Sequence, residues 1–246
     1  MVEGTKIDGV YVVHGIAGYE LREELLENLL NKQYKLDAEF VTESRVPEEN
    51  EGLLQKYFID DIRNILGKGS AFCTLVHILI YEKIVKNKNR YAIIFENDVC
   101  FIGNKFLDRI KLVENEADTL EEGFIISLEN STLEFPSLWK LKKNKYLYEA
   151  KSGRCAGAYM IDRKAAELML NDIKINKCKD VIDWWHNDLI NRNVLKMYWA
   201  HPALTEQGSF NGKLPSSISV RNNGFTRQIR WNVQKIYKTY LLRLFK

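Results

Sequence analysis

The chain of 246 residues is long enough to bury the core of one sizeable α/β domain. Hydrophobic residues make up 46% of it and charged residues 28%, a balance that excludes a disordered polypeptide. No run of about 20 apolar residues is present, which excludes a membrane-spanning helix, and the first residues lack the basic flank and cleavage site of a signal peptide. We therefore expect a folded protein that stays in the cytoplasm.

Short apolar runs alternate with helical patterns along most of the chain. Strands are predicted at 10–14, 39–42, 91–95, 124–128 and 156–161, and helices at 21–30, 73–86, 106–113 and 163–170. The segment PEENEGL after Val46 is polar, which predicts a surface loop. The alternation predicts an α/β fold with a largely parallel central sheet flanked by helices.

The four cysteines are spread singly, with no CxxC pair, at Cys73, Cys100, Cys155 and Cys178. This spacing argues against a zinc framework and against a disulfide framework. We expect all four to be reduced and most of them to be small buried residues.

The formal net charge of +3 conceals an uneven distribution. Residues 208–246 contain eight Lys and Arg and no Asp or Glu, which leaves residues 1–207 with a formal net charge of −5. A basic segment behind an acidic body is not the footprint of a nucleic-acid-binding domain, so no nucleic-acid partner is expected. We predict a domain over residues 1–210 and a basic tail over residues 211–246.

The segment YAIIFENDV is the centre of the predicted chemistry. YAIIF has the pattern of a strand buried on both faces, and Glu96, Asn97 and Asp98 follow directly where it ends. In an open parallel sheet, ligands bind beyond the carboxyl ends of the strands. Carboxylates one residue apart in a turn can coordinate one hard divalent cation, which would neutralise a departing diphosphate. Taken alone, however, the tripeptide is better explained as an acidic turn after a strand.

Several segments together resemble the bacterial glycosyltransferases of family 25, the lipooligosaccharide galactosyltransferase type. VYVVHGIAGYELREELLENL is similar to the first strand and turn of that family, with Arg22 in the place of a family arginine. GSAFCTLVHILIYEKIV is similar to a Gly-x-x-x-Cys-x-Leu-Ser-His helix and keeps His77, with Val76 in place of the serine. CAGAYMIDRKAAELML resembles a family strand and helix start and keeps Tyr159, while HPALTEQ resembles a Pro-Pro-Leu-x-x-Gln segment and keeps Gln207.

The acidic turn also resembles the family, with two departures near it. A Glu-Asp-Asp-Val strand end appears here as Glu96, Asn97, Asp98 and Val99, so Asn97 removes one carboxylate. Gly157 stands in the place of a family histidine. The resemblance covers roughly residues 6–210, and the order and spacing of the segments are more specific than any one of them.

The resemblance implies a GT-A nucleotide-diphospho-sugar transferase fold and an activity to match. Such an enzyme would transfer a hexose, by resemblance galactose, from a UDP-sugar to a lipid-linked oligosaccharide acceptor in lipooligosaccharide biosynthesis, with inversion at the anomeric carbon. The implied cofactor is Mn²⁺ or Mg²⁺, held by Asp98 and Glu96. The implied donor-binding residues are Arg22, His77, Glu96, Asn97, Tyr159 and Gln207.

Two other functions remain open from the sequence. The loss of a carboxylate at Asn97 favours a catalytically weak or inactive relative that binds a sugar nucleotide or a glycan. An unrelated α/β enzyme that uses magnesium for phosphoryl transfer is disfavoured, because no Walker-type glycine loop is present. His77 is explained equally well as a nucleotide contact and as a satisfied histidine inside a helix that packs on the sheet.

The catalytic base is open among three carboxylates, since an inverting displacement requires one near the attacking hydroxyl. Asp183 is the first candidate, although a helix cap before WWHNDLI explains it nearly as well. Asp188 and Asp180 are its rivals. Trp184 and Trp185 have faces that would stack on an acceptor sugar, but paired tryptophans are at least as often part of a core.

The tail predicts an amphipathic helix with a basic polar side. One face carries Ile229, Val233, Ile236, Tyr237, Tyr240, Leu241 and Leu244. A peripheral membrane anchor, a helix docked on the domain and a nucleic-acid arm are all conceivable. We favour the anchor, with Trp231, Tyr237, Tyr240 and Phe245 in an anionic lipid interface, which would place the protein on the inner face of the cell membrane.

Overall fold

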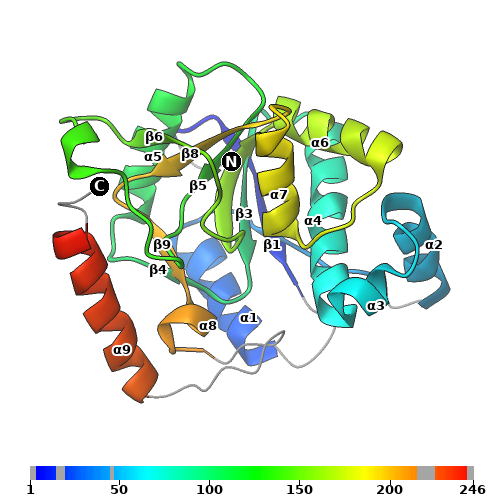
Figure 1. Ribbon diagram of the computed structural model, residues 1–246, viewed down its shortest axis with the longest axis horizontal. Coiled ribbons are helices and arrows are strands. Elements are labelled where there is room, and N and C mark those ends of the chain that lie inside the picture. The colour runs from blue at the N-terminus through cyan, green and yellow to red at the C-terminus, as the bar shows by residue number, and fades with distance from the viewer. Residues whose placement is uncertain (1–3, 15–19, 45–46, 215–224, 243–246) are drawn as a thin grey trace.

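A seven-stranded sheet forms the centre of the computed structural model, which describes residues 4–14, 20–44, 47–214 and 225–242 (Figure 1). The strand order is β2-β1-β3-β7-β5-β8-β6, and a separate two-stranded sheet pairs β4 with β9. The strands are β1 (Ile7–Val13), β2 (Glu39–Val41), β3 (Tyr91–Glu96), β4 (Val99–Phe101), β5 (Phe124–Ser127), β6 (Leu147–Ala150), β7 (Ala158–Asp162), β8 (Lys196–Ala200) and β9 (Thr205–Gln207).

Most strands of the central sheet run in one direction. β1 is parallel to β2 and β3, and β5 is parallel to β8. β7 is antiparallel to both of its neighbours, β3 and β5, and β6 is antiparallel to β8. Only β7 and β6 therefore oppose the common direction, which confirms the predicted α/β class with a mostly parallel sheet.

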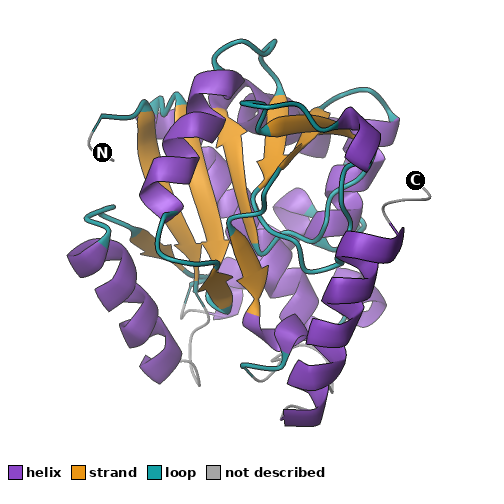
Figure 2. Cartoon of the chain, turned by 90° about the vertical axis from the view of Figure 1, so that its left-hand side faces the viewer, coloured by secondary structure: helices purple, strands orange, loops and turns teal. Residues whose placement is uncertain are grey.

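Helices cover both faces of this sheet, as Figure 2 shows. Along β1, Tyr11 and Val13 point into the core on one face, while Val10 and Val12 point into the core on the other. The first core includes residues of α4, α6 and α7, and the second includes residues of α1 and α5. The helices are α1 (Glu20–Glu27), α2 (Pro47–Tyr57), α3 (Ile62–Leu66), α4 (Lys68–Asn87), α5 (Phe106–Ala117), α6 (Arg163–Asn176), α7 (Ile182–Asn191), α8 (Gly208–Asn211) and α9 (Phe225–Ile236), with shorter helical turns at Asn28–Gln33, Leu138–Lys140 and Tyr237–Leu241.

The topology brings distant segments to one edge of the sheet. β3 ends there at Glu96 and β5 ends there at Ser127, while the antiparallel β7 begins there at Ala158. Pairing of β4 with β9 adds Gln207, which lies opposite Val99. Residues from four regions of the sequence therefore meet where the parallel strands end.

The predicted loop after Val46 is wrong, because residues Pro47–Tyr57 form α2. Its sequence carries helix-start signals, namely a proline at the first position followed by Glu48 and Glu49 in the first turn. Leu54 and Tyr57 are buried against the core, so an apolar side stabilises the helix. The polar letters PEENEG belong to its first turns.

Helix α9 docks on the body of the protein through one side. Trp231 is buried and Lys235 forms an ion pair with Glu206. In the helical turn that follows α9, Lys238 donates to the carbonyl of Thr132 over 3.1 Å. The burial of Trp231 corrects its predicted place in a lipid interface. The described part of the predicted apolar face points outward, with fractional exposures of 46–68% at Ile229, Val233, Ile236, Tyr237, Tyr240 and Leu241.

The division at residue 210 stays a prediction, and Leu244 and Phe245 lie outside the described residues. All four cysteines are free thiols, but only Cys178 is buried and the other three are half-buried, so the expectation of burial is wrong for most of them. Across the described segments, we find no helix with the length and apolar character that crossing a bilayer requires.

Candidate active site

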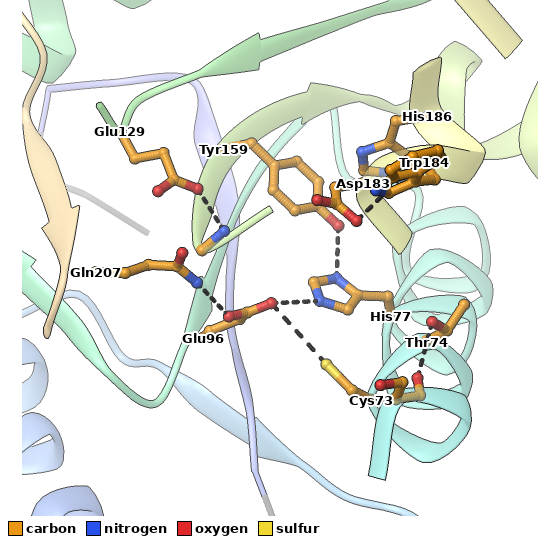
Figure 3. Close-up of polar contacts among 12 residues, drawn as sticks. Cys73, Thr74, His77, Glu96, Glu129, Tyr159, Asp183, Trp184, His186 and Gln207 are labelled. Carbon is orange, nitrogen blue, oxygen red and sulfur yellow. Dashed lines mark hydrogen bonds and ion pairs between the residues drawn. The ribbon is translucent and has the colours of Figure 1, made fainter. Parts of the chain in front are cut away.

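Glu96 is the centre of a polar cluster at the carboxyl edge of the sheet (Figure 3). Its Oε2 accepts a hydrogen bond of 2.6 Å from Nε2 of Gln207. Its Oε1 lies 3.7 Å from Nε2 of His77 and 3.9 Å from Sγ of Cys73. Burial raises the pKa of the Glu96 carboxyl to about 7. Three of the predicted donor-binding residues therefore meet in one cluster.

A chain of buried hydroxyl and imidazole groups extends from His77 into the core. Nδ1 of His77 is 2.7 Å from the Tyr159 hydroxyl, which is 2.6 Å from the hydroxyl of Tyr81. Tyr81 continues the chain to Nε2 of His186 over 2.8 Å. Burial lowers the pKa of both histidines to about 3, so both are neutral at physiological pH. Tyr159 contacts His77 from within the core, which makes it a supporting residue of the cluster in this structure.

Asp98 lies in the turn between β3 and β4 and is only 6% exposed. Its backbone carbonyl accepts from the N–H of Gly208 over 2.8 Å, and its Oδ2 accepts from the N–H of Ser209 over 3.2 Å. Its Oδ1 is buried and has no hydrogen-bond partner among the described residues. Burial, followed by the charge of Glu96, raises the pKa of this carboxyl. A buried carboxylate oxygen without a donor fits a cation-binding role.

Arg22 and Asn97 form the outer part of the site. Nη1 of Arg22 donates to Oδ1 of Asn97 over 3.3 Å, and Nδ2 of Asn97 donates to Oε1 of Glu23 over 2.9 Å. The amide of Asn97 therefore joins the arginine and the glutamate of α1, using one donor and one acceptor. An aspartate at this position would lack the donor that the Glu23 carboxylate accepts.

Asp183 lies in the first turn of α7 and is half-buried. The helix begins after Val181, so Asp183 is not its N-cap residue, although Oδ1 of Asp183 accepts from the first-turn N–H of Trp184 over 3.0 Å. Burial raises the pKa of the Asp183 carboxyl, and the charge of Glu96 raises it further. The neighbouring tryptophans separate, because Trp184 is 68% exposed and Trp185 is 2% exposed in the core. Figure 3 shows Asp183 and Trp184 on the same side of the cluster as His77.

Asp188 and Asp180 do not join the cluster. Oδ2 of Asp188 accepts from Nε of Arg192 over 2.9 Å, and the same guanidinium binds Asp172 with two contacts of 2.8 Å. These contacts tie α7 to α6. Asp180 precedes α7, and its carbonyl lies 3.4 Å from Sγ of Cys178. The structure therefore brings only Asp183, among the three candidate bases, into electrostatic contact with Glu96.

Glu129 is a buried acid that the sequence interpretation missed. Its Oε1 accepts from the N–H of Gly157 over 2.6 Å, and the hydroxyl of Ser131 donates to its Oε2. Burial raises its pKa to about 8. A signal was available, because FIISLE places an acid after a buried strand much as YAIIFE does.

Arg154 is a buried cation that no pattern in the sequence predicts. Its side chain is inaccessible to solvent and donates to the carbonyls of Ser127, Glu134 and Ala200 over 3.1–3.3 Å. Burial lowers its pKa to about 9, which leaves the guanidinium charged at neutral pH. Its hydrogen bonds connect the segment before β7 to the ends of β5 and β8.

These features define an α/β protein with a buried acidic site at the carboxyl edge of its sheet. The model of one protein family, "Glycosyltransferase family 25 (LPS biosynthesis protein)", matches residues 19–183, which is more than half of the chain. The matched residues include α1, the α4 cluster, the acidic turn and Asp183. The chain therefore belongs to glycosyltransferase family 25 and is a glycosyltransferase.

Other comparisons add little. No curated protein matches this chain. Among solved structures, one match is a protein from Bacillus anthracis assigned as a glucose-1-phosphate thymidylyltransferase, in complex with a sucrose. It is 13% identical, with 92% of this chain and 94% of that chain covered at a TM-score of 0.41.

Proposed function

We propose that this glycosyltransferase transfers a hexose, galactose by family resemblance, from a UDP-sugar to a lipid-linked oligosaccharide acceptor in lipooligosaccharide biosynthesis. The observation that carries the proposal is the buried Asp98 carboxylate, whose Oδ1 has no partner among the described residues. It lies at the sheet edge where α/β folds bind ligands, within the segment that matches family 25.

Asp98 would hold a divalent cation, Mn²⁺ or Mg²⁺, with Glu96 as the second predicted ligand. When bound, such a cation supplies charge neutralisation for the departing diphosphate. For Glu96 and Asp98 to bind the same cation, the Glu96 side chain would have to rotate. Its two carboxylate oxygens now face Gln207 and the Cys73–His77 pair. Arg22, half-buried next to Asn97, adds a positive charge for the donor phosphates.

Asp183 is our proposed base. In a single inverting displacement the acceptor hydroxyl loses its proton to Asp183, its oxygen bonds to the anomeric carbon, and the bond from that carbon to UDP breaks. A carboxyl with a raised pKa is a better proton acceptor than an ordinary carboxylate, and the pKa of Asp183 is raised by burial. The exposed ring of Trp184 next to it offers a surface for the acceptor sugar.

The outer face of α9 supports a further part of this proposal, attachment to an anionic membrane surface on the cytoplasmic side. Docking leaves Ile229, Val233 and Ile236 exposed on a helix that is rich in Arg and Lys. Lipid would bury these side chains while the basic residues contact anionic headgroups. A lipid-linked acceptor would then be presented in the same plane.

The first test measures UDP release from UDP-galactose and other UDP-hexoses with Mn²⁺, with and without an oligosaccharide acceptor. We expect release from at least one donor, and a loss of metal-dependent nucleotide binding in Asp98→Asn at nearly unchanged stability. The exposed Asp60 provides a control, since Asp60→Asn changes charge equally and should keep wild-type activity. Full activity in Asp98→Asn would contradict the assignment of the metal site.

Asn97 favours one alternative function: the protein would be a family relative that binds a sugar nucleotide without turning it over. The amide of Asn97 is hydrogen-bonded to Arg22 and Glu23, so this position does not supply a further carboxylate to a cation. Binding of UDP without hydrolysis or transfer, for every UDP-sugar tried, would favour this alternative over the transferase.

A further inference from the structure

Three side chains with metal-binding atoms converge at the end of β3, two residues before Asp98. Cys73 and His77 are four residues apart on α4, so their side chains lie on one face of the helix. Glu96, at the end of β3, points its Oε1 at both of them (Figure 3). The thiol sulfur, Nε2 of His77 and the carboxylate oxygen all lie within 4.8 Å of one another.

His77 is the unusual member of this group. Its side chain is fully buried, and its Nε2 has no hydrogen-bond partner among the described residues. The 3.7 Å separation from Glu96 is too long for a hydrogen bond. Because burial keeps this imidazole neutral, the pair is not an ion pair either. A buried nitrogen that faces a carboxylate without bonding to it requires an explanation.

The buried hydroxyl chain can determine which ring nitrogen of His77 is unprotonated. If Nδ1 of His77 donates to Tyr159, then Tyr159 can donate to Tyr81 and Tyr81 can donate to Nε2 of His186. Every contact in this direction has one donor and one acceptor. Nε2 of His77 is then an unprotonated lone pair aimed at Glu96, an arrangement that a cation between them would stabilise.

We propose that Cys73, His77 and Glu96 bind a zinc ion, with a fourth coordination position open to water or to another ligand. Thiolate, imidazole and carboxylate are zinc's usual ligands, at about 2.0–2.3 Å, which correspond to tetrahedral edges of roughly 3.3–3.8 Å. The distances from Oε1 of Glu96 to Nε2 of His77 and to Sγ of Cys73, 3.7 and 3.9 Å, are close to these edges. Three protein ligands with an open fourth position are typical of zinc sites that act on a ligand.

The surroundings support a zinc site in two further ways. Tyr159 holds Nδ1 of His77, and Gln207 holds the second oxygen of Glu96, so outer contacts orient two of the three ligands. Cys73 and Glu96 are half-buried, so two of the three ligands are accessible to solvent, while His77 is fully buried.

This site differs in chemistry from the one proposed at Asp98. Oxygen ligands such as the Asp98 carboxylate suit Mg²⁺ and Mn²⁺, whereas a thiolate with an imidazole selects zinc and its neighbours in the transition series. Zinc binding to Cys73, His77 and Glu96 goes beyond the proposed function and does not require that the chain transfer galactose. It uses Glu96 in the orientation that the structure shows, so a cation at Asp98 would then be held by Asp98 without Glu96.

Cobalt titration of the metal-free protein tests the proposal, because tetrahedral Co²⁺ is coloured and a thiolate ligand adds a charge-transfer band. We expect one equivalent of Co²⁺ to produce both signals, Zn²⁺ to abolish them, and excess Mg²⁺ to leave them. Cys73→Ser should lose the charge-transfer band, and His77→Gln should weaken Co²⁺ binding by more than about tenfold.

Two variants serve as controls. Cys100→Ser removes another half-buried thiol and should keep the band. Asp98→Asn should also keep it, which separates failure of this site from failure of the transferase proposal. If Cys73→Ser does not fold, slower alkylation of Cys73 in the wild type with one equivalent of Zn²⁺ supports the site, and an unchanged rate contradicts it. Absence of the band in the wild type, or its presence in folded Cys73→Ser, would overturn the proposal.

Discussion

Gly157 is the residue on which the position of Gln207 depends. A Cβ added at Gly157 would lie 2.4–2.7 Å from three atoms of the Gln207 side chain, closer than real contacts permit. Gly157→Ala should therefore displace Gln207 and remove the 2.6 Å hydrogen bond to Glu96. We expect a loss of about 1–3 kcal/mol in the free energy of unfolding, measured by urea denaturation.

Gly52→Ala is the matched control for that substitution. Gly52 lies inside α2, and an added Cβ would meet no atom within 4 Å. Alanine is favoured over glycine inside a helix by up to about 1 kcal/mol, so this variant should be slightly stabilised. Equal effects of the two substitutions would show that Gln207 is not held by the absence of a side chain at Gly157.

At this scale, the sequence predicted which residues gather but not how they bond. Glu96, His77 and Gln207 were all predicted at the donor site, and Glu96 does lie next to both of the others. Cys73 was interpreted as a small buried residue, although its spacing from His77 already placed both on one helix face. The roles of Glu129 and Arg154 depend on bonds to backbone groups distant in sequence, which no local pattern encodes.

Helix α9 offers a way to separate docking from membrane attachment. Its inner side carries Trp231 and Lys235, while Val233 and Ile236 are exposed on its outer side. Val233→Glu with Ile236→Glu should abolish sedimentation with vesicles that contain anionic lipid and should leave unfolding by urea nearly unchanged. The reason is that charged side chains disfavour entry into the lipid interface, whereas both positions are mostly exposed in the folded protein.

Trp231→Ala is the complementary change at the same helix. It removes a buried aromatic side chain, so it should lower the free energy of unfolding by about 3 kcal/mol or undock the helix. Deletion of residues 225–246 would mix the two effects, since it also removes the partner of Glu206. Unchanged sedimentation of the Val233→Glu, Ile236→Glu variant would contradict membrane attachment through this face.

Elements were predictable where one pattern dominated. The strands at β1, β3, β5 and β7 appeared as continuous apolar runs because both faces of the sheet are covered. α2 was missed because its first turns are polar and only its later turns pack on the core. β9 is three residues long and exists through its pairing with β4, a contact between positions more than 100 residues apart.

The molecule as a whole buries ionisable groups whose effects on pH stability have opposite signs. The pKa of His186 falls to about 3 on folding, so the unfolded chain binds more protons below about 6.5 and stability decreases as pH falls. The pKa of Glu129 rises to about 8, so the folded chain binds more protons and stability decreases as pH rises toward 8. These opposing effects partly cancel between about pH 4.5 and 6.5, and the wild-type curve alone does not separate them.

Comparing the free energy of unfolding of wild type with that of His186→Gln does separate the two effects, because the difference contains only the contribution of His186. Tyr81, Tyr159, Trp185 and His77 surround or approach this imidazole, and all of them are present in both proteins. Relative to the variant, wild type should lose about 1.4 kcal/mol of unfolding free energy for each pH unit below about 6. Urea denaturation between pH 7.5 and 4.5 measures this slope. Parallel curves for wild type and His186→Gln would show that the His186 imidazole takes up its proton at the same pH in the folded and in the unfolded chain. Below about pH 6.5 a protonated His186 would donate to Tyr81, so the hydroxyl chain would donate toward Nδ1 of His77 and leave the proton on Nε2, where the zinc proposal requires a lone pair.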